Sequence, residues 1–260
     1  MTSPDLVSII TPALNAKATI QDTYASLASQ THEAWEWLIV DDGSTDGTLE
    51  WLRECAASDS RVNPLTHTNP PSIAAARQTA LDHAKGRWVA FIDADDIWLP
   101  EKLARQIAFM KEKGAAFSFT AFRRFRDDGT AGAVFNTALL GRLIPVPPKL
   151  GYWSFAANTA IATSSAMLDM TKVETLSVPQ VLCEDYATWL GLLRRGFVAQ
   201  GLNEDLLRYR VRTVSSSSNK WENIKRVWHI LRKVEGLSLL PALYCTASYI
   251  ARGFLKHFSF

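Results

Sequence analysis

The feature that most constrains the fold is a repeated unit, in which a short β-rich apolar run ends in polar residues and a segment with helical spacing follows. The apolar runs are Leu6–Thr11, Trp35–Val40, Trp88–Ile92 and Ala115–Phe122. Apolar residues recur with the spacing of helices in the segments 18–29, 48–57, 73–84 and 101–113. Strands that alternate with helices indicate an α/β domain with a mainly parallel sheet flanked by helices.

Two prolines set expected limits for these elements. Pro12 follows the first apolar run directly, and we expect it to end that strand. Pro100 precedes the helical segment 101–113, and we expect it to be the first residue of that helix, where proline is favoured.

Acidic residues follow two of the expected strands, as Asp41-Asp42 and as Asp93-Ala94-Asp95-Asp96. In open α/β sheets, ligands bind beyond the carboxyl ends of the strands. Neighbouring carboxylates repel each other unless a cation is present, and oxygen ligands with room for waters and a phosphate suit Mg²⁺ or Mn²⁺. The alternative is a solvated turn in which Asp96 alone caps the following helix.

Two other ligand classes do not fit these residues. A calcium loop that began at Asp42 would have Arg53 at its twelfth position, where a bidentate Glu is required. The first strand–helix turn, Thr11–Ala16, lacks the GxGxxG pattern of dinucleotide-binding proteins.

The second half of the chain is less regular. We expect a loop at Arg142–Trp153, a strand at Asn158–Leu168, a helix at Tyr186–Arg195 and a strand at Leu206–Arg210. The segment Trp221–Val234 then has apolar residues on one helical face and Lys or Arg on much of the other.

The order of the motifs carries a family resemblance. The chain reads VSIITPxxN, VDDGSTDGT, an Ala-Arg helix at residues 73–84, and then WVAFIDADDIWLPEKL. This order resembles the family-2 glycosyltransferases of the GT-A fold, whose mainly parallel sheet is Rossmann-like. The resemblance covers about residues 6–212. It is closest to bacterial enzymes that extend surface polysaccharides, of the teichuronic-acid and O-antigen type, through the stretches Leu99–Phe119 and Tyr209–Lys220.

The resemblance implies a domain division and a donor site. Residues 1–218 would form the GT-A catalytic domain, with a nucleotide-binding half at about 1–122 and an acceptor and catalytic half at 123–218. The donor would be a nucleotide diphospho-sugar, and a UDP-sugar is favoured. In the implied donor site, Pro12 and Asn15 lie beside the base, and Asp42 accepts a hydrogen bond from the base N3–H. Arg77 lies on the nucleotide side, and Asp93 and the adjoining Ala94 lie by the ribose. Asp95 would be the ligand of Mn²⁺ or Mg²⁺, and Arg212 would lie at the diphosphate.

The resemblance also implies a catalytic base. Glu184 and Asp185 match an acidic pair that precedes a helix in the family. Asp185 would be the general base, and Glu184 would orient the site or contact the acceptor. One base without a second carboxylate nucleophile implies inversion at the anomeric carbon. The alternative is that both carboxylates only favour the N-terminus of the helix that follows.

Three departures from the family pattern affect which base and sugar we expect. Leu14 stands where a base-stacking Tyr is common, and Gln78 replaces the Asn of an A-R-N motif. Asn69-Pro70-Pro71 stands where a Gly is often found. Uridine is the nucleoside that we expect in the donor, and guanosine or thymidine are the alternatives.

The charges separate the body of the chain from its tail. The formal net charge of +2 predicts no nucleic-acid partner. Seven Lys or Arg against two Glu lie in residues 219–260, which we expect to form a basic amphipathic helical tail. The tail could lie on the inner-membrane surface, which would suit a glycan acceptor linked to polyprenyl diphosphate. It could instead pack on its own domain or join two subunits in a homodimer.

The cysteines and the N-terminus bear on the compartment. Three widely spaced cysteines without a CxxC motif favour a reducing environment. Met1–Asp5 is polar and precedes a strand directly, so we expect no signal peptide and a cytoplasmic protein, at most peripheral to the membrane. Two rival functions stay open: a non-catalytic sugar-nucleotide or glycan-binding protein on the same scaffold, and a nucleotidyltransferase.

Overall fold

A computed structural model describes residues 5–127, 137–211 and 220–257 of the chain. The first half contains β1 (Val7–Ala13), α1 (Ile20–Ala28), β2 (Trp35–Asp41), α2 (Thr48–Ser58), β3 (Val62–Thr66), α3 (Ile73–His83), β4 (Trp88–Phe91), β5 (Ile97–Trp98), α4 (Lys102–Lys113) and β6 (Phe117–Arg126). The second half contains a 3₁₀ turn (Thr137–Leu139), β7 (Leu140–Ile144), β8 (Lys149–Leu150), α5 (Tyr152–Ala156), a 3₁₀ turn (Thr163–Ser165), β9 (Met167–Asp169), α6 (Met170–Val173), α7 (Glu184–Arg194) and β10 (Ala199–Val211). The tail contains α8 (Lys220–His229), a π-helical turn (Ile230–Val234) and α9 (Leu239–His257).

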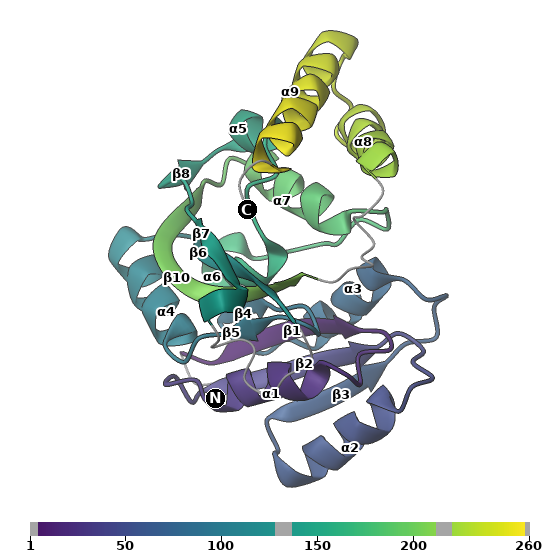
Figure 1. Ribbon diagram of the computed structural model, residues 1–260, viewed down its shortest axis with the longest axis vertical. Helices are drawn as coiled ribbons and strands as arrows, with labels where there is room; N and C mark the ends of the chain where they lie inside the picture. Colours follow the sequence, from purple (N-terminus) through teal and green to yellow (C-terminus); the bar gives the residue numbers. More distant parts are fainter. Residues whose placement is uncertain (1–4, 128–136, 212–219, 258–260) are drawn as a thin grey trace.

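The strands of the described residues form one continuous sheet with the order β3-β2-β1-β4-β9-β6-β10-β5 (Figure 1). Strands β3, β2, β1 and β4 run parallel, as the alternation of strands and helices predicts. Strand β9 is antiparallel to both β4 and β6, whereas β6 and β10 are parallel to each other. The sheet is therefore mixed, with its parallel part in the first half of the chain.

Side chains of the central strands alternate between two apolar layers. Ile9 and Trp37 point to the layer that contains α1 and α4, and Ile10 and Leu38 point to the layer that contains α3 and α7. This alternation follows from the two-residue period of a strand. Because helices cover both faces, these strands are continuous apolar runs, as buried parallel strands usually are.

Both proline expectations are wrong in detail. Strand β1 continues through Pro12 to Ala13. Beyond Ile10 it pairs only with β2, so the missing N–H of Pro12 breaks no hydrogen bond to a strand on the other side of β1. Helix α4 begins at Lys102 with Glu101 as its N-cap, so Pro100 lies outside the helix.

Several elements of the structure differ from the sequence expectations. Strands β3 and β5 were not expected. The strand expected at Asn158–Leu168 is irregular up to Ala162, and a 3₁₀ turn and the start of the short β9 follow. The loop expected at Arg142–Trp153 contains part of β7, β8 and the start of α5. Strand β10 starts at Ala199, seven residues before the expected start, and pairs with β6 across two register shifts.

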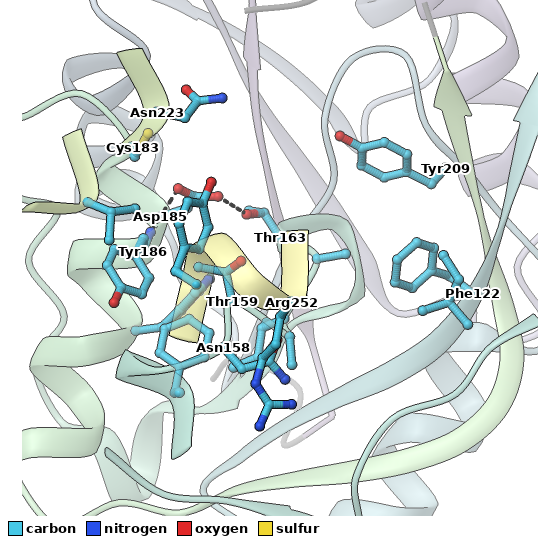
Figure 2. Close-up of a pocket in the computed structure, with 18 of the residues that line it drawn as sticks. Phe122, Asn158, Thr159, Thr163, Cys183, Asp185, Tyr186, Tyr209, Asn223 and Arg252 are labelled. Atoms are coloured by element: carbon cyan, nitrogen blue, oxygen red, sulfur yellow. Dashed lines mark hydrogen bonds between the residues drawn. The ribbon is translucent and has the colours of Figure 1, made fainter. Parts of the chain in front are cut away.

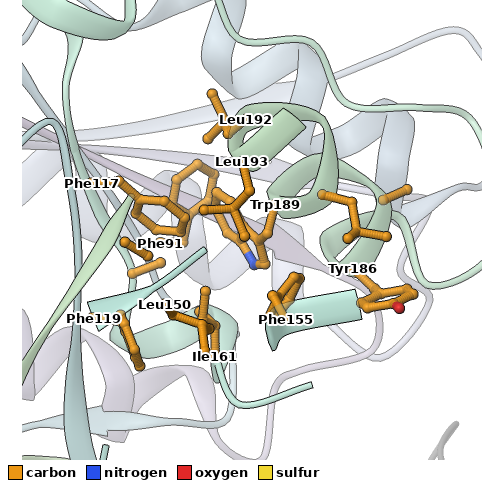
Figure 3. Packing of buried hydrophobic residues seen from close by; sticks show 14 of the residues in the cluster. Phe91, Phe117, Phe119, Leu150, Phe155, Ile161, Tyr186, Trp189, Leu192 and Leu193 are labelled. Carbon is orange, nitrogen blue, oxygen red and sulfur yellow. The ribbon is translucent and has the colours of Figure 1, made fainter. Parts of the chain in front are cut away.

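Aromatic packing holds α7 against the sheet. The Trp189 ring lies 5.2 Å from the ring of Phe91 and 5.1 Å from the ring of Phe117, between centroids (Figure 3). At the start of the helix, the Tyr186 hydroxyl donates to the carbonyl of Ala156 at 2.8 Å. These contacts fix the N-terminal turn of α7, which carries Glu184 and Asp185.

The tail packs on the body through one apolar face. Val227, Ile230, Leu231, Ala242 and Cys245 are buried in the same apolar layer as α7.

Polar contacts close the same junction between tail and body. The buried Glu235 carboxylate accepts a hydrogen bond from the Tyr152 hydroxyl at 2.9 Å. The backbone carbonyl of Glu235 accepts a hydrogen bond from the Arg194 guanidinium at 2.7 Å. Packing on the body of its own chain, one of the alternatives for the tail, is therefore observed for part of the tail surface.

Candidate active site

The loops that follow β1 and β2 brace each other. The Asn15 backbone, at φ 50°, donates to the Ser44 hydroxyl at 2.9 Å, and the Asn15 side-chain oxygen accepts from the Thr45 N–H at 2.9 Å. Pro12 pairs with Val40 in the last part of β1. Pro12 and Asn15 therefore lie at the carboxyl edge of the sheet, where the sequence predicts a nucleotide site.

The two aspartates after β2 have different environments. The Asp41 carboxylate accepts from the N–H groups of Gly43 and Ser44 and so builds the turn. Asp42 Oδ1 accepts from the N–H of Ser72, the N-cap of α3, at 2.9 Å. His67 Nε2 lies 2.8 Å from the same oxygen. Asp42 is thus held between the end of β3 and the start of α3. Nothing in the sequence singled out His67, because a lone His in a loop matches no motif.

The acidic cluster after β4 is organised by a serine. The Asp93 N–H donates to the Ser164 hydroxyl at 3.0 Å, and that hydroxyl donates to Asp96 Oδ2 at 2.5 Å. Asp96 is buried, and burial, followed by the charges of Asp95 and Asp93, raises its pKa well above the usual value. Strand β5 follows Asp96 directly, so the alternative that Asp96 caps a helix is wrong.

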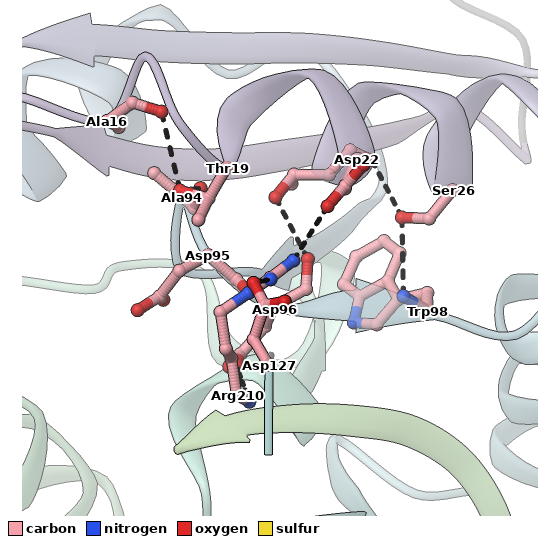
Figure 4. Close-up of polar contacts among 11 residues, drawn as sticks. Ala16, Thr19, Asp22, Ser26, Ala94, Asp95, Asp96, Trp98, Asp127 and Arg210 are labelled. Carbon is pink, nitrogen blue, oxygen red and sulfur yellow. Dashed lines mark hydrogen bonds and ion pairs between the residues drawn. The ribbon is translucent and has the colours of Figure 1, made fainter. Parts of the chain in front are cut away.

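Arg210 of β10 anchors the Asp95–Asp96 segment from the other side (Figure 4). Its N–H donates to Asp96 Oδ1 at 2.9 Å, and its guanidinium donates to the Asp95 carbonyl at 2.7 Å and to Asp22 Oδ2 at 2.9 Å. The guanidinium also contacts Asp127. The sequence drew attention to the neighbouring Arg212 instead, which lies outside the described residues.

Ala94 is held by a separate contact. Its carbonyl accepts a hydrogen bond from the Thr19 hydroxyl at 2.9 Å, which ties the cluster to the start of α1 (Figure 4). All members of the Asp93–Asp96 segment are thus positioned by residues distant in the chain.

Arg77 of α3 joins the two halves of the site. Its side chain is 4% exposed, donates to Asp93 Oδ1 at 2.6 Å and also pairs with Glu184 of α7. Burial by itself lowers the pKa of Arg77, but the negative charges of Asp93, Glu184 and Asp185 raise it above its usual value. Both terminal nitrogens contact carboxylates, so Arg77 links Asp93 to the helix that carries Asp185.

The adjacent carboxylates at the start of α7 differ in exposure. Glu184 is buried, and burial raises its pKa to about 7 against the opposing effect of Arg77. Asp185 is half-buried, and its carboxylate accepts from the Thr163 hydroxyl at 2.9 Å and from the Tyr186 N–H at 2.7 Å (Figure 2). Cys183, at φ 61°, makes the turn into the helix. Of the pair, Asp185 is the one that lines a cavity.

That cavity has a volume of about 1060 Å³ and contains the carboxylates of both halves, Asp93 and Asp185. Apolar and aromatic residues of α5, α7, α8 and α9 make up much of its wall. The polar and basic residues in its lining are Asp93, Arg124, Arg142, Asn158, Thr159, Thr163, Asp185, Tyr209, Asn223 and Arg252.

The acidic cluster fits a divalent cation only together with a ligand. No group of three or more His, Cys, Asp or Glu residues in the described ranges could hold a metal ion by itself. Asp93 is paired with Arg77, and Asp96 accepts from Ser164 and Arg210. The expected cation on Asp95 would therefore need further oxygen ligands, such as those of a bound diphosphate. This arrangement suits Mg²⁺ or Mn²⁺, which are commonly held by one or two carboxylates plus substrate phosphates.

Comparison with known proteins agrees with this geometry. The model of the family described as Glycosyl transferase family 2 matches residues 8–158. TuaG of Bacillus subtilis (strain 168), named as a teichuronic acid biosynthesis glycosyltransferase, is 40% identical over 245 residues, which are 94% of each chain. The UDP-Glc:alpha-D-GlcNAc-diphosphoundecaprenol beta-1,3-glucosyltransferase WfgD of Escherichia coli is 36% identical, over 97% of this chain and 95% of its own.

Solved structures show the same fold. TarS residues 1–349 of S. aureus in complex with UDP-GlcNAc superpose with a TM-score of 0.67 at 18% identity, over 95% of this chain and 72% of that one. The mannosyltransferase PcManGT of Pyrobaculum calidifontis, in complex with GDP-Man and Mn²⁺, gives a TM-score of 0.62 at 18% identity, over 93% of this chain and 68% of that one. The expected GT-A fold is confirmed.

Proposed function

The chain belongs to glycosyl transferase family 2 and is a transferase enzyme, and we propose that it moves a sugar from a UDP-sugar to a lipid-linked glycan with inversion at the anomeric carbon. The observation that carries this proposal is the Arg77 bridge, which holds Asp93 and the Asp185 helix at one cavity. The product would be a bacterial surface polysaccharide, in keeping with the names of TuaG and WfgD.

The donor would bind at the carboxyl edge of β1, β2 and β4. Pro12 and Asn15 would border the base, and Asp42 would accept from its N3–H. Asp93 and Ala94 would lie by the ribose, and Arg212 would contact the diphosphate. UDP in a TarS complex and GDP-Man in the PcManGT complex support a nucleotide ligand for this fold. Arg77 would act on this site through Asp93, since both of its terminal nitrogens contact carboxylates.

Asp95 would hold a divalent cation, Mn²⁺ or Mg²⁺. When bound, the cation would stabilise the negative charge that develops on the leaving nucleoside diphosphate. Ser164 and Arg210 hold the segment that carries Asp95, so its direction would be fixed before the donor arrives.

Asp185 would be the general base. As the acceptor oxygen bonds to the anomeric carbon and the bond to UDP breaks, the acceptor proton would pass to the Asp185 carboxylate. The Thr163 and Tyr186 hydrogen bonds would orient that carboxylate toward the cavity. Glu184, buried against Arg77, would position the helix.

Replacement of the proposed base tests the function. We expect Asp185→Asn to lower kcat by roughly 10²- to 10⁴-fold, because a general base typically contributes that much. The measurement is release of UDP in the presence of Mn²⁺ and an acceptor, with UDP affinity measured alongside. Asp82→Asn, at an exposed position of α3, is the matched control. Wild-type turnover by a folded, UDP-binding Asp185→Asn protein would reject the assignment.

A donor panel separates the rival functions. UDP-, GDP- and dTDP-sugars are offered in turn, and the released phosphate compound is identified. Release of a nucleoside diphosphate is expected, with the UDP-sugar the best donor. Release of pyrophosphate would indicate a nucleotidyltransferase, and binding without any release would indicate a non-catalytic protein.

We also propose a peripheral position on an anionic membrane surface. No helix within the described ranges has the length and apolarity needed to cross a bilayer. Leu239, Leu240, Leu243 and Tyr244 at the start of α9 are exposed. Arg232 and Lys233 precede them in the chain. Exposed apolar residues next to basic ones are typical of helices that lie in the lipid interface.

A further inference from the structure

The Asp42 carboxylate uses one of its two oxygens within the protein. Oδ1 accepts a hydrogen bond from the Ser72 N–H at 2.9 Å and lies 2.8 Å from His67 Nε2. Oδ2 has no hydrogen-bond partner among the described residues. It is not fully buried, in contrast to the unpartnered Oδ1 of the neighbouring Asp41. Asp42 Oδ2 is therefore the oxygen of this acidic pair that can meet a ligand.

The contact with Asp42 determines which nitrogen of the His67 ring carries a hydrogen. A carboxylate oxygen can only accept, so His67 Nε2 must donate to it. The His67 side chain is 6% exposed. Its other ring nitrogen, Nδ1, is buried and has no partner in residues 5–127, 137–211 and 220–257. A buried imidazole whose one hydrogen bond in these ranges goes to Asp42 serves to position that carboxylate.

The apolar neighbours of Asp42 cannot tell one base from another. The Asp42 N–H donates to the Ala13 carbonyl at 2.8 Å, which places Asp42 beside the loop that carries Leu14. Leu14 is 51% exposed, and an aliphatic side chain can pack on the face of any base. Bases differ in the hydrogen-bonding groups at their edges, so a polar partner such as Asp42 Oδ2 has to distinguish them.

Uracil and cytosine differ at the edge that would face Asp42. Uracil has an N–H at N3, which a carboxylate can accept. Cytosine has a lone pair at N3, which repels a carboxylate, and an amino group beside it. A carboxylate that could turn freely would reach that amino group. Because two donors hold Asp42 Oδ1, the carboxylate cannot turn without losing hydrogen bonds.

We propose that His67 is a positioning residue that sets the base specificity of the donor site. Together with the Ser72 N–H, it fixes Asp42 so that Oδ2 accepts a base with an N–H at N3 and rejects cytosine. This role of His67 rests on the proposed donor site at Asp42, but nucleotide binding tests it without turnover.

The first test compares the binding of UDP and CDP to the full-length protein by calorimetry, at one Mg²⁺ concentration. The two nucleotides share the ribose and the diphosphate, so the ratio of their affinities reports on the base. We expect the wild type to favour UDP by about tenfold or more, the typical effect of a hydrogen bond to a charged group. Equal affinity for UDP and CDP would overturn base selection at Asp42.

Replacement of His67 tests its role directly. His67→Phe keeps a ring and removes the donor, so UDP affinity should fall by about tenfold and CDP affinity by less. His67→Gln should restore part of the preference, because its side-chain amide can donate to Asp42. His83→Phe, at an exposed position of α3, is the matched control and should leave the ratio unchanged. Equal weakening of UDP and CDP in His67→Phe would indicate a merely structural role and overturn the proposal.

A further variant tests the fixed orientation with His67 in place. In Asp42→Asn, the Ser72 N–H and the His67 Nε2–H both require an acceptor, so the side-chain oxygen should take the position of Oδ1. The amide NH₂ would then face the base and donate to the N3 of cytosine. We expect Asp42→Asn to prefer CDP over UDP. A preference for UDP in this variant would overturn the fixed orientation.

The role of His67 and the transferase proposal fail separately. If the UDP-to-CDP ratio responds as expected but no sugar nucleotide is turned over, the transferase proposal fails and the role of His67 stands. If a UDP-sugar is turned over and His67→Phe leaves the ratio unchanged, the role of His67 fails and the transferase proposal stands.

Discussion

At the scale of single residues, Arg77 joins the two halves of the site through its ion pairs with Asp93 and Glu184. Its replacement by Met would leave Glu184 and Asp93 without their cation, and Glu184 is buried. Removing one partner of a buried ion pair typically destabilises a protein by about 3–5 kcal/mol. We expect a loss of this order for Arg77→Met, measured by urea denaturation.

The Arg77 prediction has two controls. Adding Glu184→Gln to Arg77→Met should recover part of the loss, because the buried charge is then removed as well. Arg105→Met breaks an exposed pair with Glu204 and should have little effect on the free energy of unfolding. An equal effect of the Arg77 and Arg105 replacements would contradict the bridging role.

Lys102 provides a prediction on pH. It is fully buried in the first turn of α4, its Nζ has no hydrogen-bond partner among the described residues, and it lies 3.6 Å from the centre of the Trp98 ring. Burial lowers the pKa of Lys102 well below its usual 10.5. Between its lowered pKa in the folded state and 10.5, Lys102 is therefore more protonated in the unfolded chain than in the folded chain, and its contribution to stability rises with pH in that window.

Lys102→Met should accordingly stabilise the fold near neutral pH, by at least about 1 kcal/mol if the pKa differs by one unit or more. The difference between the two proteins in the free energy of unfolding should become smaller as the pH rises toward 10. The measurement is a series of urea denaturation curves from pH 7 upward. Lys113→Met, at the exposed end of the same helix, should show no such trend. A difference that stays constant with pH would contradict the assignment.

At the scale of elements, the sequence predicted the strands that show as apolar runs and the acidic motifs that follow them. Strands β1, β2 and β4 are apolar runs, and the acidic clusters lie at the ends of β2 and β4 as expected. Strand β3 was missed because Val62–Thr66 contains Asn and Pro, which are rare in strands. It pairs only with β2, at the edge of the sheet, where such residues are tolerated.

Part of the candidate site could not be predicted for a similar reason. His67, Thr163 and Ser164 contact the predicted aspartates only after the chain has folded, from positions that no motif marks. Arg210 lies in the Tyr209–Lys220 stretch, but nothing there predicts its contact with Asp96. The motif residues themselves were found because their spacing is local. The long-range contacts that orient them depend on the sheet order, which the sequence pattern does not contain.

The aromatic packing of α7 predicts a coupling between stability and catalysis. Trp189→Ala would leave a void beside Phe91 and Phe117 and should cost about 3–5 kcal/mol. Because α7 carries Asp185, kcat should fall more than the donor KM changes. Trp189→Phe retains a ring and loses no hydrogen bond among the described residues, since the indole N–H has no partner there, so it should be the milder change. Equal kcat losses in the two variants would contradict this coupling.

At the scale of the whole molecule, the tail has an inner face that packs on the body and an outer face that is exposed. Its inner face joins the apolar layer of α7 and lines the cavity beside Asp185. The start of α9 keeps Leu240 77% exposed and Tyr244 69% exposed. The sequence predicted a helical tail over residues 219–260, but periodicity marked an amphipathic face only at residues 221–234, because the apolar run of α9 is interrupted by Pro241. A proline in the first turn of a helix is compatible with helical backbone, which explains why α9 still forms.

The outer face of the tail leads to the last prediction. If it lies on an anionic membrane, full-length protein should sediment with phosphatidylglycerol-containing liposomes at low salt and less so at high salt, because salt screens the attraction of Arg232 and Lys233. Leu240→Asp should weaken liposome binding by about tenfold or more, since it removes an apolar side chain that would enter the lipid and adds a charge of the wrong sign. Val198→Asp changes an exposed apolar residue outside the tail and should leave binding unchanged. Equal sedimentation of all three proteins would mean that the exposed face of α9 does not contact lipid, and a concentration-dependent dimer lost only in Leu240→Asp would identify a second subunit as its partner.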